Sequence, residues 1–133
     1  LLMATMSGVE VNLMFPCKPD HPFVYWATLS YVGELIMAGA NCYTYDNGFL
    51  HAKGLSIDGK ACCYGTANMD IRSFELNFEV NAMIFDQNIA GEMERIFRED
   101  LKCCTRITKE MYKSRSVWIR FKEQISRLLS PVL

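Results

Sequence analysis

Apolar and polar residues alternate along an early segment of the chain, which predicts a β-strand there. The first strand is expected at residues 9–15, ending at Pro16, because proline cannot donate a hydrogen bond to a neighbouring strand. A shorter β-like segment follows at residues 41–46. Residues 1–7 resemble the last turns of a helix, and Gly8 is a typical helix stop.

A period close to 3.6 residues predicts three longer helices. The first is expected at residues 23–38 with a stop at Gly39, the second after a cap at Asp86, and the third at about residues 116–129. Their apolar stripes consist of Trp26, Leu29, Val32, Gly33 and Ile36, then Ile89, Met93, Ile96 and Phe97, then Trp118, Phe121, Ile125, Leu128 and Leu129.

A hairpin is predicted between the first two of these helices. Residues 49–57 and 60–64 are expected to pair as antiparallel strands around an Asp-Gly turn, which is a strong hairpin signal. A loop at residues 65–73 and a further strand at residues 75–85 should follow. We therefore predict an α/β fold, a mixed β-sheet flanked by helices, in a single domain spanning residues 1–133.

Charge is distributed unevenly, although the net charge of the 133 residues is only −1. Residues 1–100 contain six Lys and Arg against thirteen Asp and Glu, whereas residues 101–133 contain eight against two. We interpret residues 105–133 as a basic, amphipathic, helical C-terminal segment. Its apolar stripe is suited to packing on the domain, on another part of a longer protein or on a bilayer interface, and the sequence does not choose between these.

Cysteine and histidine usage does not favour a metal site. The six cysteines include two adjacent pairs but no C-x-x-C motif, and there are only two histidines. Reduced thiols in a cytoplasmic environment are the simplest interpretation. No stretch reaches the roughly 18 consecutive apolar residues of a membrane-spanning helix, so any membrane contact of this chain is expected to be peripheral.

The most informative feature is a motif with the spacing H-x-K-x4-D-x6-G-T-x-N. It consists of His51, Lys53, Asp58, Gly65, Thr66 and Asn68. This pattern resembles the phospholipase D superfamily, whose members exchange phosphodiesters through a phosphohistidine intermediate and use one such motif from each of two similar halves. The chain contains one motif, so the resemblance implies half of a catalytic site.

The residue types suit phosphodiester exchange, which needs a nucleophile, an acid for the leaving alkoxide and cations around the phosphoryl oxygens. His51 and Lys53, two apart on the predicted strand, should share one face, and Thr66 and Asn68 can add phosphate-binding donors. We also include Asp58 of the motif in the predicted catalytic set, although its place in an Asp-Gly turn favours a role in fixing the hairpin.

A catalytic imidazole also needs a partner for its second nitrogen. The superfamily uses an acidic residue on the strand after the G-[S/T]-x-N loop, and Glu79 resembles that residue. We therefore predict Glu79 as the fourth catalytic residue. The resemblance implies neither a metal nor another cofactor.

The resemblance extends over nearly the whole chain. Stretches around residues 19–26, 47–53, 65–74, 77–81 and 127–131 are similar to the C-terminal half of bacterial cardiolipin synthases. This implies a phosphatidyltransferase that converts two phosphatidylglycerol molecules into cardiolipin and glycerol. The implied partners are a separate N-terminal catalytic half and the anionic cytoplasmic face of the bacterial cell membrane, to which the full-length protein would be anchored.

Within that scheme the N-terminal histidine is usually the nucleophile. His51 would then act as acid and base, although two neighbouring histidines titrate as a coupled pair.

Two other hypotheses stay open. The first is a phosphodiesterase or nuclease that completes its site as a homodimer, but the acidic balance of residues 1–100 argues against nucleic acid as a partner. The second is a non-catalytic module that binds a membrane surface and retains the motif as scaffold.

Overall fold

A computed structural model describes residues 1–18 and 22–129 of the chain. The chain forms two compact units, one made of Leu1–Leu50 with Cys104–Leu133 and one made of His51–Cys103. We call them the terminal unit and the motif unit. Between the first predicted strand and the first predicted helix, residues 19–21 lie outside the described residues.

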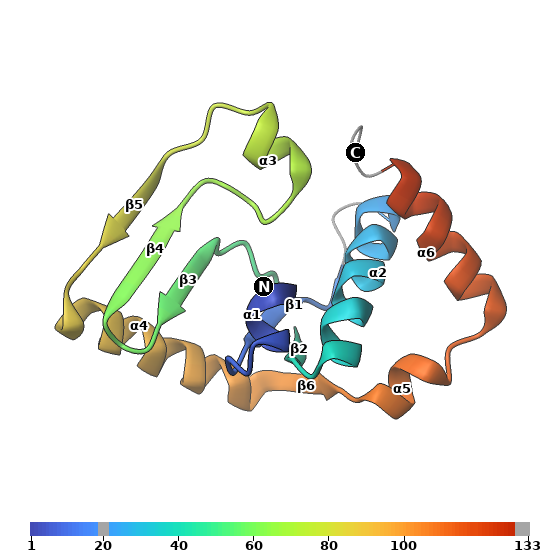
Figure 1. Cartoon of the computed structure of the whole chain (residues 1–133), viewed down its shortest axis with the longest axis horizontal. Coiled ribbons are helices and arrows are strands. Elements are labelled where there is room, and N and C mark those ends of the chain that lie inside the picture. The colour runs from blue at the N-terminus through green and yellow to red at the C-terminus, as the bar shows by residue number, and fades with distance from the viewer. Residues whose placement is uncertain (19–21, 130–133) are drawn as a thin grey trace. The chain divides into compact units, whose positions relative to one another are not determined.

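The terminal unit contains a three-stranded mixed sheet and four helices (Figure 1). Its elements are α1 (Leu2–Met6), β1 (Asn12–Pro16), α2 (Pro22–Ala38), β2 (Asn41–Tyr45), β6 (Cys104–Ile107), α5 (Lys109–Lys113) and α6 (Val117–Leu129). The strand order is β1-β2-β6, with β1 parallel and β6 antiparallel to β2. The parallel pair is connected by α2, as a parallel crossover requires.

The core of this unit lies between α2 and the sheet. It consists of Phe15, Val32, Leu35, Ile36, Ala40 and Cys42, which are all buried. The glycine of the α2 stripe, Gly33, has a packing reason, because a Cβ there would collide with the ring of Tyr112. Small size at position 33 thus lets the segment after β6 pack on α2.

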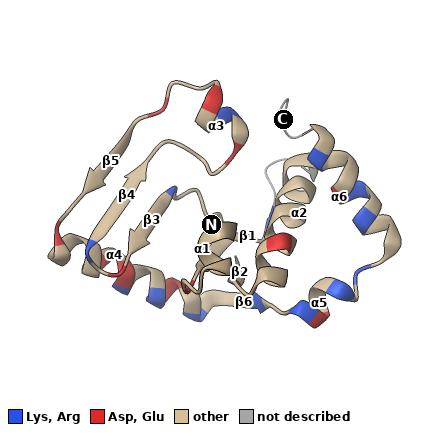
Figure 2. Cartoon of the chain, in the orientation of Figure 1, with Lys and Arg blue, Asp and Glu red and all other residues tan. Residues whose placement is uncertain are grey.

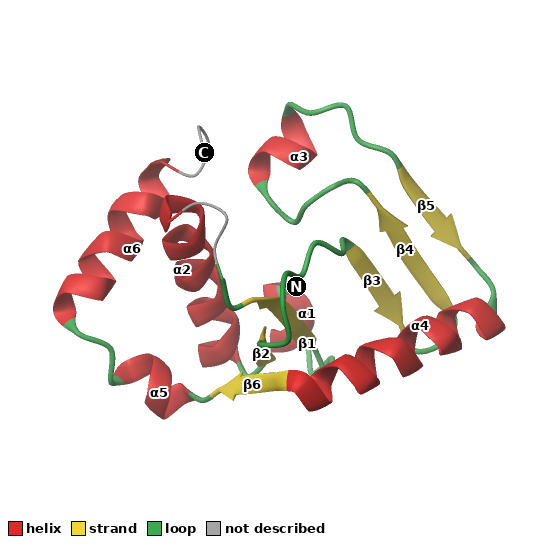
Figure 3. Ribbon diagram, turned by 180° about the vertical axis from the view of Figure 1, so that it is seen from behind, coloured by secondary structure: helices red, strands yellow, loops and turns green. Residues whose placement is uncertain are grey.

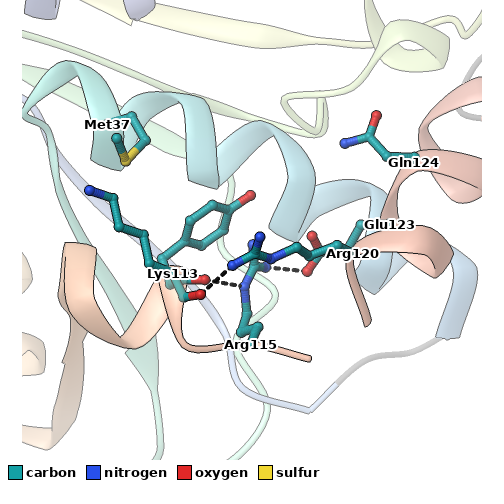
Figure 4. A pocket seen from close by; sticks show the side chains of 7 residues that line it. Met37, Lys113, Arg115, Arg120, Glu123 and Gln124 are labelled. Carbon is teal, nitrogen blue, oxygen red and sulfur yellow. Dashed lines mark hydrogen bonds and ion pairs between the residues drawn. The ribbon is translucent and has the colours of Figure 1, made fainter. Parts of the chain in front are cut away.

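Residues of α5, α6 and the end of α2 line an open cavity of about 250 Å³ (Figure 4). Within it, Arg115 forms an ion pair with Glu123, whose side chain is almost fully buried. The guanidinium also lies over the Tyr112 ring, 3.3 Å from its centroid. Burial raises the pKa of Glu123 even though Arg115 opposes the shift, since desolvation disfavours the charged form.

The motif unit contains an antiparallel sheet of order β3-β4-β5 (Figure 3). Its elements are β3 (Gly54–Ile57), β4 (Ala61–Gly65), α3 (Ile71–Glu75), β5 (Asn81–Ile84), α4 (Gln87–Asp100) and a short 3₁₀ helix (Leu101–Cys103). The helix α4 packs on β3 and β4 and buries Ala90. Asp86 caps α4 by accepting from the backbone N–H groups of Asn88 and Ile89.

The structure confirms the α/β class with a mixed sheet and flanking helices, and the three long helices lie where periodicity predicts them. The strands form two small sheets, one mixed and one antiparallel. The Asp-Gly turn is also confirmed: Asp58 and Gly59 have φ values of 51° and 60°, as in a type I′ hairpin turn.

Four segment predictions were wrong. The strand expected at residues 49–57 begins only at Gly54. The loop at 65–73 and the strand at 75–85 are replaced by α3 and a later, shorter β5, because the Asp70 carboxylate accepts from the backbone of Ser73 and starts a helical turn. The C-terminal segment is not helical throughout, since β6 reaches Ile107 and pairs with β2.

Candidate functional site

The histidine and lysine of the motif lie directly before β3, in a loop outside the sheet. They therefore do not share a strand face as the sequence pattern predicted. Instead, Lys53 Nζ donates to the backbone oxygen of His51, 3.0 Å away. The backbone N–H of Gly65 donates to the Lys53 oxygen at 3.2 Å, which joins this segment to the end of β4. His51 is exposed and Lys53 is half-buried.

The threonine of the motif is fixed to the segment before β5. The backbone N–H of Thr66 donates to the Val80 oxygen at 3.0 Å, and its hydroxyl accepts from the Val80 N–H at 2.9 Å. Gly65 permits this approach, because a Cβ there would collide with backbone atoms of Val80 and Asn81. The glycine is thus required by a close contact between β4 and the β5 segment.

Glu79 is the centre of a cluster of polar side chains that includes Thr66, Ser73, Asn77 and Lys53. Hydrogen bonds from Thr66, Asn77 and Ser73, together with the nearby charge of Lys53, hold the pKa of its carboxyl below the ordinary value. Asn77 Nδ2 lies 3.2 Å from Glu79 Oε1. Glu79 lies in the extended chain before β5, not on a strand, and it is a half-buried carboxylate stabilised in its ionised form.

Asn68 enters the cluster through its backbone. Its N–H donates to the hydroxyl of Ser73 at 3.1 Å, and Ser73 is buried at the start of α3. The α3 cap holds Ser73 in this place, since its own N–H donates to Asp70 Oδ1 at 2.7 Å. The side-chain amide of the exposed Asn68 is not part of these contacts.

Asp58 is separated from the rest of the motif. It lies in the hairpin turn after β3, whereas Lys53 lies before the same strand, so the length of the strand, about 16 Å, separates them. The structure therefore brings together Lys53, Thr66, Glu79 and the backbone of Asn68, with His51 beside Lys53, and leaves Asp58 at the other end of the hairpin.

The residues that sequence reasoning missed are Ser73 and Asn77, which both bond Glu79. The available signal was weak: Asn77 stands two positions from Glu79, and Ser73 three positions from a potential cap, Asp70. Among residues 1–18 and 22–129, no group of three or more His, Cys, Asp and Glu side chains is placed to hold a metal ion.

A sequence profile described as "Cardiolipin synthase, PLD-like domain" matches residues 1–101, which include every residue of this cluster. The chain belongs to this family. Cardiolipin synthase family proteins are also similar over its full length. The chain is 56% identical over 133 residues to the major cardiolipin synthase ClsA of Bacillus subtilis, to a cardiolipin synthase of Oceanobacillus iheyensis and to cardiolipin synthase 1 of Staphylococcus epidermidis.

The match covers all of this chain but only 27–28% of those cardiolipin synthases. The chain thus corresponds to little more than a quarter of the relatives' length. The profile of the cardiolipin synthase domain ends before β6, so α5 and α6 lie outside it, whereas the similarity to the three relatives includes them. Within the part of the chain that is described, no helix is long and apolar enough to cross a membrane.

Proposed function

We propose that this chain supplies one half of the catalytic site of a phosphatidyltransferase that converts two phosphatidylglycerol molecules into cardiolipin and glycerol. The observation that carries the proposal is the cluster around Glu79, where an ammonium and hydroxyl donors gather beside His51. Such donors suit a phosphodiester, whose charge is concentrated on its oxygens. Family membership and the names of the relatives support the choice of substrate.

The cycle we propose divides the exchange into two displacements. A histidine from the other half attacks phosphorus and forms a phosphatidyl-histidine, while His51 protonates the departing glycerol. His51 then takes the proton from the hydroxyl of a second phosphatidylglycerol, which attacks phosphorus and releases the first histidine. Lys53, Thr66 and Asn68 are assigned to the phosphoryl oxygens, and no metal or other cofactor takes part.

Glu79 is assigned to keep this donor set in place. Its carboxylate holds Thr66 and Ser73 by hydrogen bonds and favours the charged form of Lys53. Its predicted contact with the imidazole of His51 stays a prediction. Asp58 is assigned to the turn, because Asp and Asn adopt positive φ at low cost and this position is remote from Lys53.

The second histidine must come from outside the described residues, since His51 is the only histidine within them. We assign it to a separate N-terminal catalytic half, because the relatives are more than three times longer than the match. A homodimer is the other route to two motifs. In the full-length protein we place the site at the cytoplasmic face of the bacterial membrane, where phosphatidylglycerol is present.

Nucleic acid is a poor substrate for this surface. The cations of α4 and of the short 3₁₀ helix after it are already paired with neighbouring carboxylates, as in Arg95–Glu92, Arg98–Glu94 and Lys102–Glu99. Nucleic-acid binding rests largely on phosphate neutralisation by unpaired cations. The helix α4 therefore offers no strip of unpaired cations to a polyanion.

The proposal is tested in a chimera in which this chain replaces the matching 133 residues of the Bacillus subtilis relative. Cardiolipin formed from phosphatidylglycerol vesicles is measured by chromatography. The His51→Ala variant should lose activity by about 10²-fold or more, since it removes a proton-transfer group. Asp58→Asn, which preserves the turn, is the matched control and should retain most activity.

A chimera that is folded and membrane-bound but forms no cardiolipin would overturn the substrate assignment. Equal loss in the Asp58→Asn variant would instead overturn the structural role given to that residue.

A further inference from the structure

The C-terminal helix α6 packs with its polar side inward. Its two fully buried residues are Glu123 and Ser126, and it contacts α2. The apolar residues lie outward: Val117 is 78% exposed, Trp118 76% and Leu128 82%. The sequence left three possible partners for this apolar stripe: the domain itself, another part of a longer protein, or a bilayer interface. The structure shows that the stripe does not pack on α2, the helix of the domain that α6 contacts.

The exposed apolar residues form one continuous face. At 3.6 residues per turn, Val117, Leu128, Phe121, Ile125, Trp118 and Leu129 fall within an arc of about 120°. Glu123 and Ser126 lie on the opposite side. Val117, Trp118 and Phe121 also line a shallow cavity of about 330 Å³, and the Trp118 and Phe121 rings meet edge to face with centroids 6.5 Å apart.

Cations border this arc on both edges. Lys122 lies at one edge, with its ammonium 5.0 Å from the Trp26 ring centroid, and Arg120 lies beyond the other edge, where it donates to the Lys113 carbonyl. Neither a ring nor a carbonyl neutralises a cation. The single acidic residue of α6, Glu123, is buried against Arg115, so no carboxylate of this helix faces outward.

The surface around α6 is also positively charged. Basic positions outnumber acidic ones along α5 and α6 (Figure 2), with six Lys and Arg against two Glu in residues 109–129. The cavity in Figure 4 is lined by Lys113, Arg115 and Arg120 around the buried carboxylate of Glu123. Glu34 of α2 pairs with Arg127, and an excess of positive charge still remains beside the apolar arc.

We propose that α6 docks this chain on the surface of an anionic lipid bilayer, with its apolar face inserted at the level of the head groups. An apolar arc with a tryptophan and bordering cations is the pattern of an interfacial helix. The bordering cations complement the negative charge of anionic head groups. The inference rests on the proposed function in one respect, since it names the surface through which a lipid-exchanging protein reaches its substrate.

The test is vesicle co-sedimentation of the chain, combined with tryptophan fluorescence. Vesicles contain equal parts phosphatidylserine and phosphatidylcholine, or phosphatidylcholine alone. Phosphatidylserine supplies negative charge without being the proposed substrate, so binding is measured independently of the reaction. In a Trp26→Phe background, Trp118 is the only reporter and its emission should shift to shorter wavelength on the anionic vesicles.

The variant Phe121→Ser with Leu128→Ser should bind at least about tenfold more weakly, because each buried apolar side chain contributes a factor of ten or more. Phe85→Ser, which changes an exposed aromatic residue of the motif unit, is the matched control and should bind normally. Lys122→Gln should weaken binding to the anionic vesicles about fivefold. His51→Ala should bind as the unaltered chain does.

Two results would overturn the inference. The folded chain could fail to bind anionic vesicles while α6 mediates association with another protein or with a second copy. Alternatively, binding could persist in Phe121→Ser with Leu128→Ser. Normal vesicle binding by a chimera that makes no cardiolipin would leave the docking surface intact and reject only the proposed function.

Discussion

Cys42 shows how strongly position in the fold can change the chemistry of a single residue. It lies in the middle strand of the terminal sheet, opposite Leu13 of β1 and Ile107 of β6. Burial raises the pKa of its thiol to about 11, because the thiolate is poorly solvated there. At pH 8 only about one molecule in a thousand carries the reactive thiolate.

We therefore expect Cys42 to resist alkylation in the native chain. Brief treatment with iodoacetamide should label the exposed Cys103 and leave Cys42 unmodified until urea is added. Peptide mass mapping detects which cysteines have been labelled. Labelling of both cysteines at the same rate without urea would contradict the central position of β2.

Glu79 should make the stability of the motif unit depend on pH. The folded-state pKa of its carboxyl lies below the unfolded value of about 4.3, so the ionised form is favoured by folding. The resulting stabilisation is present above the unfolded pKa and is lost as pH falls through the folded pKa. Glu79→Gln should therefore be less stable than the unaltered chain at pH 7, and this difference should shrink in acid.

Urea unfolding at a series of pH values measures this difference. Glu75→Gln, which removes an exposed carboxylate from α3, controls for the change in net charge. A stability difference between Glu79→Gln and the unaltered chain that is the same at pH 7 and in acid would show that the Glu79 contacts are unimportant.

At the scale of elements, two glycines have opposite roles. Gly65 ends β4 where backbone atoms of the β5 segment leave no room for a Cβ, whereas Gly91 lies in α4 with open space around it. Gly65→Ala should lower the free energy of unfolding by roughly 1 to 3 kcal/mol through overpacking. Gly91→Ala should raise it by about 1 kcal/mol, because alanine is the better helix former.

Denaturant titration of the two alanine variants gives the sign of each change in the free energy of unfolding. Gly65→Ala should also reduce the activity of the chimera, since Thr66 would move away from Val80. The two changes in the free energy of unfolding need not be equal in size. If Gly91→Ala also destabilised the chain, the gain in helix propensity would be outweighed by another contact of the alanine side chain.

The elements that sequence predicted well are those whose signals are local. Caps and turns such as Asp86 and Asp58-Gly59 depend on a few adjacent residues, and both are confirmed. The apolar alternation of Phe74, Leu76, Phe78 and Val80 is typical of a strand, yet the Asp70 cap favours a helical turn there, and these side chains are exposed. The strand β6 depends on pairing with the distant β2, which no local pattern encodes.

The candidate site was predicted by residue type and spacing better than by geometry. The motif identified Lys53 and Thr66, and the resemblance added Glu79; the structure brings these three residues into one cluster. It also grouped Asp58 with them, which the hairpin places elsewhere. Ser73 was missed because its role depends on the α3 cap, a contact visible only once the chain is folded.

At the scale of the whole molecule, the chain exposes more large apolar side chains than is usual for an isolated domain. Phe74, Leu76, Phe78 and Val80 are all exposed in the motif unit, and the chain spans 28% of its Bacillus subtilis relative. Contiguous exposed apolar residues of this kind drive association. The segment at residues 74–80 is therefore expected to be covered by a protein surface in the longer protein, and to make the isolated chain self-associate.

Sedimentation velocity at increasing protein concentration tests this expectation. Phe78→Ser with Val80→Ser should shift self-association to higher concentration by about tenfold, since the apolar contact is lost while the backbone bonds of Val80 with Thr66 can persist. Met3→Ser removes an equally exposed apolar residue from α1 and should change nothing. If the chain stays monomeric at all concentrations, or if the two variants behave alike, the apolar segment at residues 74–80 is not an interaction surface, and the rest of the longer protein must meet this unit elsewhere.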